Sequence, residues 1–254
     1  MPLSEEILYE RLTPPAFESR RKAAPIAYLP LGTLEWHGPH LPLGSDHLQS
    51  QGFFIQLAKR VGGIVLPPLF LGPDTMQVAD GSEYYGMDIH QKASLEPMRL
   101  KGSAYWVPDR LFSEIVDAVL KQIRRAGFRV LVAHGHGPST EYIIKNKTIL
   151  ENKHDLKIFT VWRNKEERDP PTEFQYDHAA ANETSIMMAL HSSLVRMDHL
   201  PDDHQERPIG LIGKDPRTHA STAHGQRIVD IHLERMETLL RQQLAELTPE
   251  RADV

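Results

Sequence analysis

The chain has 254 residues, 40% hydrophobic and 25% charged, which is enough for a sizeable core, and we expect a single domain over residues 1–254. The absence of cysteine excludes disulfide scaffolds, thiolate nucleophiles and sulfur-ligated zinc, while a net charge of −5 with dispersed Arg and Lys argues against a nucleic-acid partner. No apolar run reaches the roughly 18 residues of a membrane span, and residues 1–21 lack a secretory pattern, so we expect a cytoplasmic protein without a membrane partner.

Apolar stretches of strand length alternate along the chain with segments of helical periodicity. The predicted strands cover residues 25–31, 64–69, 129–133 and 156–162. The predicted helices cover residues 45–61, 108–126, 139–152, 182–196 and 224–247. Strands that alternate with helices indicate crossover connections, so we expect the α/β fold class with a mainly parallel central sheet covered on both faces.

The strand predicted at 25–31 runs into a segment rich in Gly, Pro and His that contains Glu35 and His37. Residues two apart in an extended chain point to the same side, so these two side chains can converge on one metal ion. Asp46 follows at a predicted helix start, where its two oxygens could bridge two cations. In the alternative interpretation, Asp46 caps the helix and Glu35 and His37 form a surface pair.

Two histidines follow the strand predicted at 129–133, in the order His134, Gly135, His136, Gly137. Open α/β sheets bind their ligands at the carboxyl edge, and glycines allow a close approach there. We predict that His136 ligates a metal, and that His134 does not bind the metal itself but contacts its ligands. The alternative is an exposed turn with two incidental histidines.

A third cluster contains His178 and Glu183, near the helix predicted at 182–196. Glu183 would lie in the first helical turn, where the helix dipole favours a carboxylate even without a metal. His178 lies off the face of that helix and belongs to the preceding loop, where it could act as an acid or a base.

The candidate metal ligands are Glu35, His37, Asp46, His136 and Glu183. This set is large enough for two divalent cations that share Asp46. Carboxylate and imidazole ligands suit zinc, manganese or iron, and the ligand type does not choose among these metals. A purely structural role for the histidines is the competing interpretation.

Two long stretches, 72–105 and 163–177, show no regular pattern, and long irregular loops in compact domains are often lids or binding loops. The first stretch carries polar side chains that would suit a hydroxyl-rich ligand, and that would equally suit solvent or a subunit interface. These side chains are Asp74, Asp80, Glu83, Tyr84 and His90.

These segments resemble the creatininase (creatinine amidohydrolase) family. Residues 32–46 read Gly-Thr-Leu-Glu-Trp-His-Gly-Pro-His-Leu-Pro-Leu-Gly-Ser-Asp and are similar to the family signature Gly-Ser-x-Glu-Gln-His-Gly-x-His-Leu-Pro-Leu-x-Thr-Asp. Residues 134–137 resemble its Asn-Gly-His-Gly stretch, residues 178–185 its His-Ala-Gly and Glu-Thr-Ser stretch, and residues 213–225 a weaker fourth stretch. The resemblance covers residues 25–230 and implies a three-layer α/β/α sandwich, a two-metal hydrolase site and a homo-oligomer, often a hexamer.

The resemblance also implies roles for individual residues. Metal ligation carries over by position to Glu35, His37, Asp46 and His136, and to Glu183. Proton transfer carries over to His178. The chain departs from the family at Pro138, where creatininases proper carry a Glu, and at His134 and Ser139, where the family has Asn. Because proline cannot ligate through its side chain, creatinine is not the expected substrate.

We therefore predict a metal-dependent hydrolase that acts on a small cyclic amide or related C–N compound through a metal-bound hydroxide, with His178 protonating the leaving group. One alternative is a ring-opening hydrolase of a polyhydroxylated cyclic ketone or lactone, such as a keto-inositol. Another is a catalytically inactive protein that binds a metal or a small molecule. An inactive protein needs no proton shuttle, so replacement of His178 distinguishes it from an enzyme.

Overall fold

The computed structural model describes residues 6–90, 96–161 and 177–247. A four-stranded sheet runs through the centre, in the order β2 (Ile64–Val65), β1 (Ile26–Leu31), β5 (Val130–Gly135) and β6 (Lys157–Phe159). All neighbouring strands pair in parallel, so their carboxyl ends lie at one edge of the sheet.

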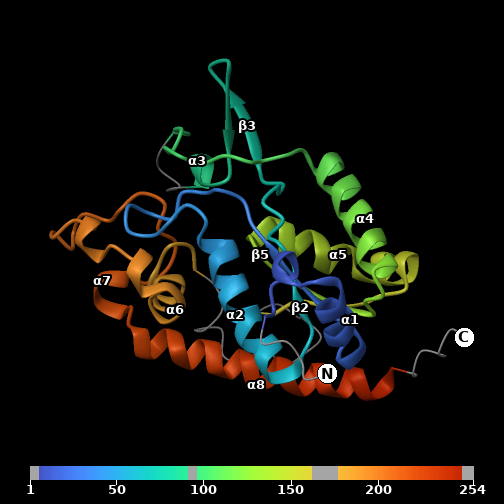
Figure 1. Cartoon of the computed structure of the whole chain (residues 1–254). Coiled ribbons are helices and arrows are strands. Elements are labelled where there is room, and N and C mark those ends of the chain that lie inside the picture. The colour runs from blue at the N-terminus through green and yellow to red at the C-terminus, as the bar shows by residue number, and fades with distance from the viewer. Residues whose placement is uncertain (1–5, 91–95, 162–176, 248–254) are drawn as a thin grey trace, which may run out of the picture.

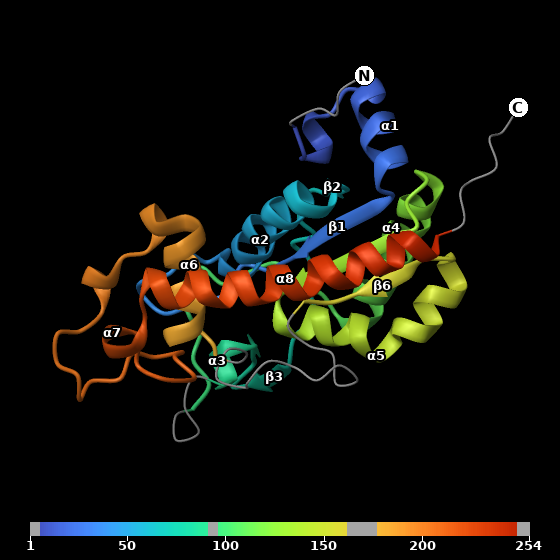
Figure 2. The same ribbon diagram turned by 90° about the horizontal axis from the view of Figure 1, so that it is seen from below.

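Helices cover both faces of this sheet (Figure 1, Figure 2). One face carries α2 (Ser45–Val61) and α8 (Thr222–Glu246), with α6 (Ala181–His191) packed against both, and the other carries α4 (Asp109–Arg125) and α5 (Gly137–His154). Within β1, Tyr28 packs with Phe54 of α2, whereas Leu29 belongs to the core cluster that contains Phe112 of α4. Every residue of β1 is buried, as expected for a strand covered on both faces, and the predicted three-layer α/β/α fold is confirmed.

The sequence pattern located most helices well and two strands less well. The helix predicted at 45–61 has those bounds, and α4 and α8 end within two residues of theirs, while α6 stops at His191 instead of 196. The strand predicted at 64–69 is only two residues long, because Pro67 and Pro68 have no N–H group for a sheet hydrogen bond. The strand predicted at 156–162 is limited to Lys157–Phe159.

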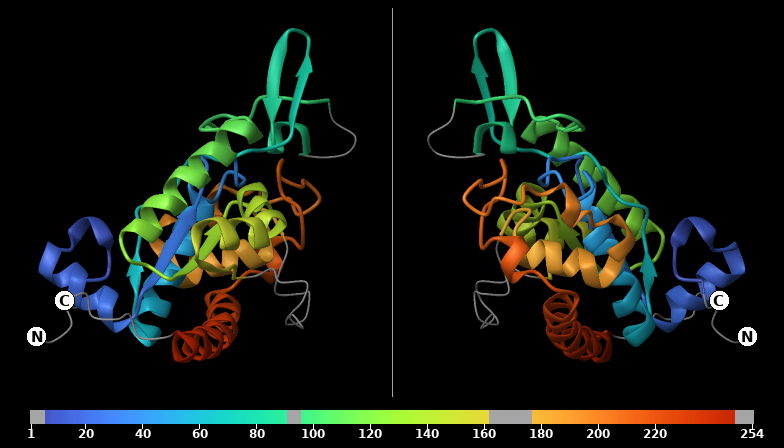
Figure 3. Two further views of the ribbon diagram at one scale, coloured as in Figure 1. Left: turned by 90° about the vertical axis from the view of Figure 1, so that its right-hand side faces the viewer. Right: turned by 90° about the vertical axis from the view of Figure 1, so that its left-hand side faces the viewer.

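The prediction of an irregular loop over 72–105 is wrong in part. A β-hairpin of β3 (Met76–Ala79) and β4 (Ser82–Tyr85) projects from the body of the molecule, and α3 (Met87–His90) follows it (Figure 1, Figure 3). Its turn residues, Asp80 and Gly81, have φ values of 50° and 72°, the left-handed conformation of a type I′ turn. Residues 163–176 of the second predicted loop lie outside the described residues.

The remaining elements in the described parts of the chain are short. They are α1 (Pro14–Ala23), α7 (Pro216–His219) and three 3₁₀ turns at Tyr9–Arg11, Ser192–Leu194 and Met197–His199. None of the helices in the described parts of the chain is long and apolar enough to cross a bilayer.

A close backbone contact fixes α6 against α8. A Cβ atom added to Gly225 of α8 would lie 1.8 Å from the carbonyl oxygen of Ser185 in α6, so only glycine fits at this crossing. The same helix, α6, carries Glu183, one of the predicted metal ligands.

Candidate metal centre

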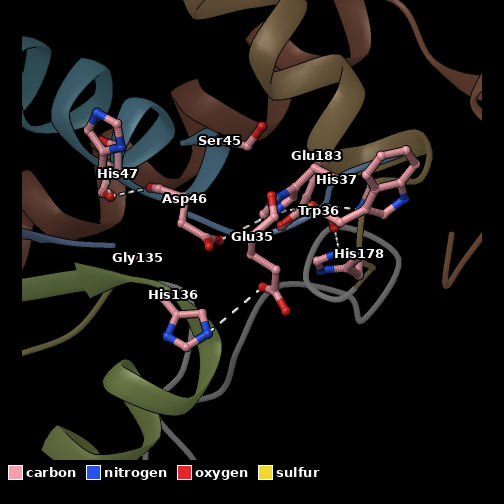
Figure 4. Close-up of polar contacts among 12 residues, drawn as sticks. Glu35, Trp36, His37, Ser45, Asp46, His47, Gly135, His136, His178 and Glu183 are labelled. Atoms are coloured by element: carbon pink, nitrogen blue, oxygen red, sulfur yellow. Dashed lines mark hydrogen bonds and ion pairs between the residues drawn. The ribbon is translucent and has the colours of Figure 1, made fainter. Parts of the chain in front are cut away.

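The predicted ligands come from four separate segments that meet beside the carboxyl edge of the sheet (Figure 4). Glu35 and His37 lie in the loop after β1, and His136 is the N-cap residue of α5 directly after β5. Asp46 and Glu183 lie in the first turns of α2 and α6. All except His37 line a cavity of about 310 Å³, which is a suitable size for a small molecule.

His37 faces two of the carboxylates. Its Nε2 atom lies 3.6 Å from Asp46 Oδ1 and 3.7 Å from Glu183 Oε2, and the imidazole is fully buried. Its Nδ1 atom lies 3.0 Å from the backbone oxygen of Glu35, an acceptor, so Nδ1 carries the hydrogen. Nε2 therefore faces the carboxylates, and once it has lost its proton it offers the lone pair that a metal ligand needs.

His136 forms a second group with Glu35 and with a residue that we did not predict as a ligand. Nε2 of His136 lies 3.8 Å from Glu35 Oε2 and 3.4 Å from Oδ2 of Asp74. Its Nδ1 atom lies 3.0 Å from the hydroxyl oxygen of Ser139, which orients the ring. The three side chains present ligand atoms within 4.8 Å of one another, as do those of His37, Asp46 and Glu183.

Two buried atoms of the cluster have no hydrogen-bond partner among the described residues. They are Nε2 of His37 and Oδ2 of Asp46. A buried polar atom without a partner costs about 1–3 kcal/mol of stability, so such atoms usually mark a site for a missing group. A divalent cation between these atoms would satisfy both, and the donor set therefore fits a metal.

The protonation behaviour of the cluster leads to the same conclusion. Burial raises the pKa of Glu35 to about 7 and the pKa of Glu183 to about 8. Burial alone would lower the pKa of His37, but the Asp46 and Glu183 carboxylates outweigh it and raise that pKa to about 10. Among the described residues that line the cavity there is no Lys or Arg, so protons are the main counter-charge until cations are supplied.

His178 lies beside the cluster, in the loop before α6, where it forms a β-bridge with Ile212. Its Nε2 atom lies 2.8 Å from the backbone oxygen of Trp36, and its ring centroid is 4.3 Å from that of His37 (Figure 4). Burial, followed by the charge of a protonated His37, lowers the pKa of His178 to about 3, so this ring is neutral at neutral pH.

The structure thus brings all six predicted site residues together, in three overlapping groups that could hold a metal: the two described above and a third of Glu35, His37 and His178. It places Asp46 with His37 and Glu183, whereas the sequence could not tell which partners Asp46 would have. His134 lines the cavity from the end of β5, next to His136. Of the loop residues that suggested a hydroxyl-rich ligand, Asp74 and His90 line the cavity, while Asp80 and Glu83 lie on the hairpin.

Asp74, which the sequence suggested only as a contact for a hydroxyl-rich ligand, is the potential metal ligand that the pattern missed. It follows β2, the strand next to β1, so its position beyond the carboxyl end of a neighbouring strand was the available signal. That signal was weak because β2 is short and the path of the chain after Pro73 does not follow from the pattern.

Fold and site together define a class of α/β proteins with a cluster of potential metal ligands at the carboxyl edge of a parallel sheet. The family model described as creatininase, creatinine amidohydrolase, matches residues 10–240. The chain belongs to the creatininase family of hydrolases.

Individual relatives agree with this assignment. A creatinine amidohydrolase from Pseudomonas putida is 25% identical over 218 residues, which are 79% of this chain and 78% of that protein. A creatininase crystal structure matches with a TM-score of 0.72 and 21% identity, covering 96% of this chain and 100% of the other. A structure described as creatininase Mn matches with a TM-score of 0.67 and 20% identity, and the match covers 94% of this chain and 98% of the other. A mutant creatininase described as the Zn–Zn type matches at 0.68 with 21% identity over 94% and 99%.

Proposed function

We propose that this protein is a two-metal hydrolase of a small cyclic amide or related C–N compound. The observation that supports it is the pairing of buried imidazole and carboxylate groups around one cavity without a Lys or Arg in its described lining. One cation would be held by Glu35 and His136, and the other by His37 and Glu183, with Asp46 contributing to the second and available for sharing.

Divalent cations held in this way, zinc or manganese in the first instance, would supply hydroxide near neutral pH and polarise the substrate carbonyl group. The protein's own contribution is orientation and proton transfer. The Glu35 carbonyl and the Ser139 hydroxyl orient the rings of His37 and His136, so Nε2 of each ring already faces the cluster and can bind a cation when its proton is displaced. Burial of Glu35, His37 and His136 lowers the local dielectric constant and so strengthens the electrostatic interactions of the cluster.

His178 is the proposed proton carrier. The Trp36 carbonyl accepts a hydrogen bond from Nε2–H, so the lone pair of the neutral ring is on Nδ1. Nδ1 can therefore accept a proton during attack on the carbonyl carbon and deliver it to the leaving nitrogen.

The lining of the cavity also bears on which substrate the protein hydrolyses. Pro138 is the second residue of α5 and offers the cavity no polar side-chain atom, so we propose a substrate other than creatinine. Of the five polar residues that suggested a hydroxyl-rich ligand, only Asp74 and His90 line the cavity, which disfavours a polyhydroxylated ketone or lactone as the substrate. From the sequence we further propose one domain, a homo-oligomer and a cytoplasmic location, which sedimentation and cell fractionation would test.

The test combines metal analysis with turnover. Purified protein should contain zinc, manganese or iron at one to two equivalents, or be activated when one of these metals is added. The reconstituted enzyme should then hydrolyse a member of a panel of cyclic amides and formamides, with creatinine, lactones and cyclic ketones as comparison substrates. Less than a tenth of an equivalent of metal, with no activation by any added metal, would reject the site.

A further inference from the structure

Asp74 occupies an unusual position for a surface-loop aspartate. It lies directly before the β3–β4 hairpin, yet its side chain is only 7% exposed. Its Oδ1 atom accepts a hydrogen bond from the backbone N–H of Thr75 at 2.6 Å. Its Oδ2 atom faces the imidazole of His136 at 3.4 Å. One oxygen therefore holds the start of the hairpin, and the other is presented to the metal centre.

Gly86, which follows the second strand of the hairpin, lies against the Asp74 carboxylate as well. The backbone N–H of Gly86 donates to the carbonyl oxygen of Thr75 at 3.0 Å, which closes the hairpin at its base. A Cβ atom on Gly86 would lie 2.4 Å from Asp74 Oδ2 and 2.8 Å from Glu35 Oε1. Gly86 also has a φ of +51°, so both its conformation and its surroundings exclude a side chain.

Asp74 also completes the charge balance of the centre. With it, the two groups contain four carboxylates, from Glu35, Asp46, Asp74 and Glu183, and no Lys or Arg is among the described residues that line the cavity. The Asp177 carboxylate in the same lining instead accepts hydrogen bonds from two backbone N–H groups of α6. Four negative charges are the number that two divalent cations neutralise. Two carboxylates buried around one imidazole repel each other unless a cation lies between them.

We propose that Asp74 is a direct ligand of the cation held by Glu35 and His136, and that this cation fastens the base of the hairpin to the edge of the sheet. This inference rests on the proposed two-metal function. A two-stranded hairpin is marginally stable by itself in water, and this one projects away from the body of the molecule (Figure 3), so its order depends on how its base is held. In this proposal the third protein ligand of that cation, after Glu35 and His136, comes from the base of the hairpin. The helix that follows His136, α5, has Pro138 in its first turn and supplies no ligand there.

The first test is metal stoichiometry in the full-length protein. Asp74→Asn keeps an oxygen for the Thr75 N–H and removes the ligand charge, so its fold should be retained. The matched control is Glu83→Gln, which alters an exposed carboxylate on the same hairpin. After equilibration with zinc or manganese, we expect two equivalents in the unchanged protein and in Glu83→Gln. We expect one tightly held equivalent in Asp74→Asn, with affinity for the other reduced by about 100-fold.

The second readout is amide hydrogen exchange in residues 76–85. Metal addition should slow exchange there in the unchanged protein and in Glu83→Gln, and should have no such effect in Asp74→Asn. Exchange in the first turn of α6, which carries Glu183, should slow in all three proteins. Retention of both cations at unchanged affinity by Asp74→Asn, or loss of both, would overturn the role of Asp74. An unchanged protein that binds no cation would instead overturn the proposed function itself.

Discussion

The Nε2 atom of His178 lies 2.8 Å from the carbonyl oxygen of Trp36, the residue between the predicted ligands Glu35 and His37. Since a carbonyl oxygen only accepts, this contact fixes the tautomer of His178 and leaves a lone pair on Nδ1. The chain therefore orients its proton carrier with the backbone of the same loop that carries two metal ligands.

Replacement of His178 should separate catalysis from metal binding. In His178→Ala, turnover should fall by about 10²- to 10⁴-fold, the usual contribution of a positioned acid or base, while metal content stays unchanged. Steady-state kinetics and elemental analysis on the same preparation check both parts. The exposed His204→Ala serves as the control and should match the unchanged protein. Turnover of His178→Ala at the full rate would reject the proton-transfer role.

The metal-free protein should become less stable as pH rises from about 6.5 to 8.5. Burial raises the pKa of Glu35 to about 7 and that of Glu183 to about 8, so the folded state holds protons that the unfolded state has already released. The raised pKa of His37, about 10, acts in the same direction. Between pH 6.5 and 8.5 the unfolded chain loses the proton of this histidine while the folded protein keeps it, so folding becomes less favourable as pH rises. Urea unfolding after chelation measures the slope.

The cation-loaded protein supplies the contrast. Bound cations keep the carboxylates ionised at all these pH values, so the loss of stability should largely disappear, and the melting temperature should rise with metal concentration. Metal-free protein that is equally stable at pH 6.5 and 8.5 would show that the carboxylates are not held protonated in the fold.

Asp177→Ala should weaken both α6 and the cation next to Glu183. The two carboxylate oxygens of Asp177 accept hydrogen bonds from the backbone N–H groups of Asn182 at 2.6 Å and Glu183 at 3.0 Å, in the first turn of α6, where N–H groups have no acceptor within the helix itself. Loss of this cap should cost about 1 kcal/mol of unfolding free energy. Asp177→Asn should lose less, because one oxygen remains. Urea unfolding measures the loss of stability, and metal titration measures the loss of affinity. Unchanged metal affinity in Asp177→Ala would show that the hydrogen bonds of Asp177 do not position Glu183 for a cation.

Gly225→Ala should be strongly destabilising although Gly225 does not line the cavity. The added methyl group would meet the Ser185 carbonyl at 1.8 Å, which forces α6 and α8 apart at a cost of about 3 kcal/mol or more. Because α6 carries Glu183, metal affinity should fall as well. The neighbouring exposed Gln226→Ala should change stability by less than about 0.5 kcal/mol. A Gly225→Ala protein as stable as the unchanged one would contradict the packing argument.

The sequence predicted the layers of this fold because each layer leaves a local signature. The helix α2 begins at Ser45 and ends before Gly62, and β1 is a continuous apolar run, so both could be located without tertiary information. The hairpin was missed although Asp80 and Gly81 are a strong turn signal, because its strands carry no clear apolar alternation.

The candidate site was predictable to the extent that its residues fall next to strand ends and helix starts. Glu35, His136 and Glu183 have such positions, and the structure brings them together. The division into two groups could not be predicted, because it depends on which loops face each other across the sheet edge. Asp74 depends on that same long-range geometry and on the fold of the hairpin base at Gly86.

The order of the strands has a consequence for how the protein reaches its active form. β1 pairs directly with β5, so the loop with Glu35 and the loop with His136 meet only after residues about a hundred positions apart have found each other. Contacts of such long sequence separation form late and slowly in folding. Cation uptake during refolding should therefore lag behind the recovery of helical circular dichroism, and a chelator added in that interval should intercept a chain that already has its helices.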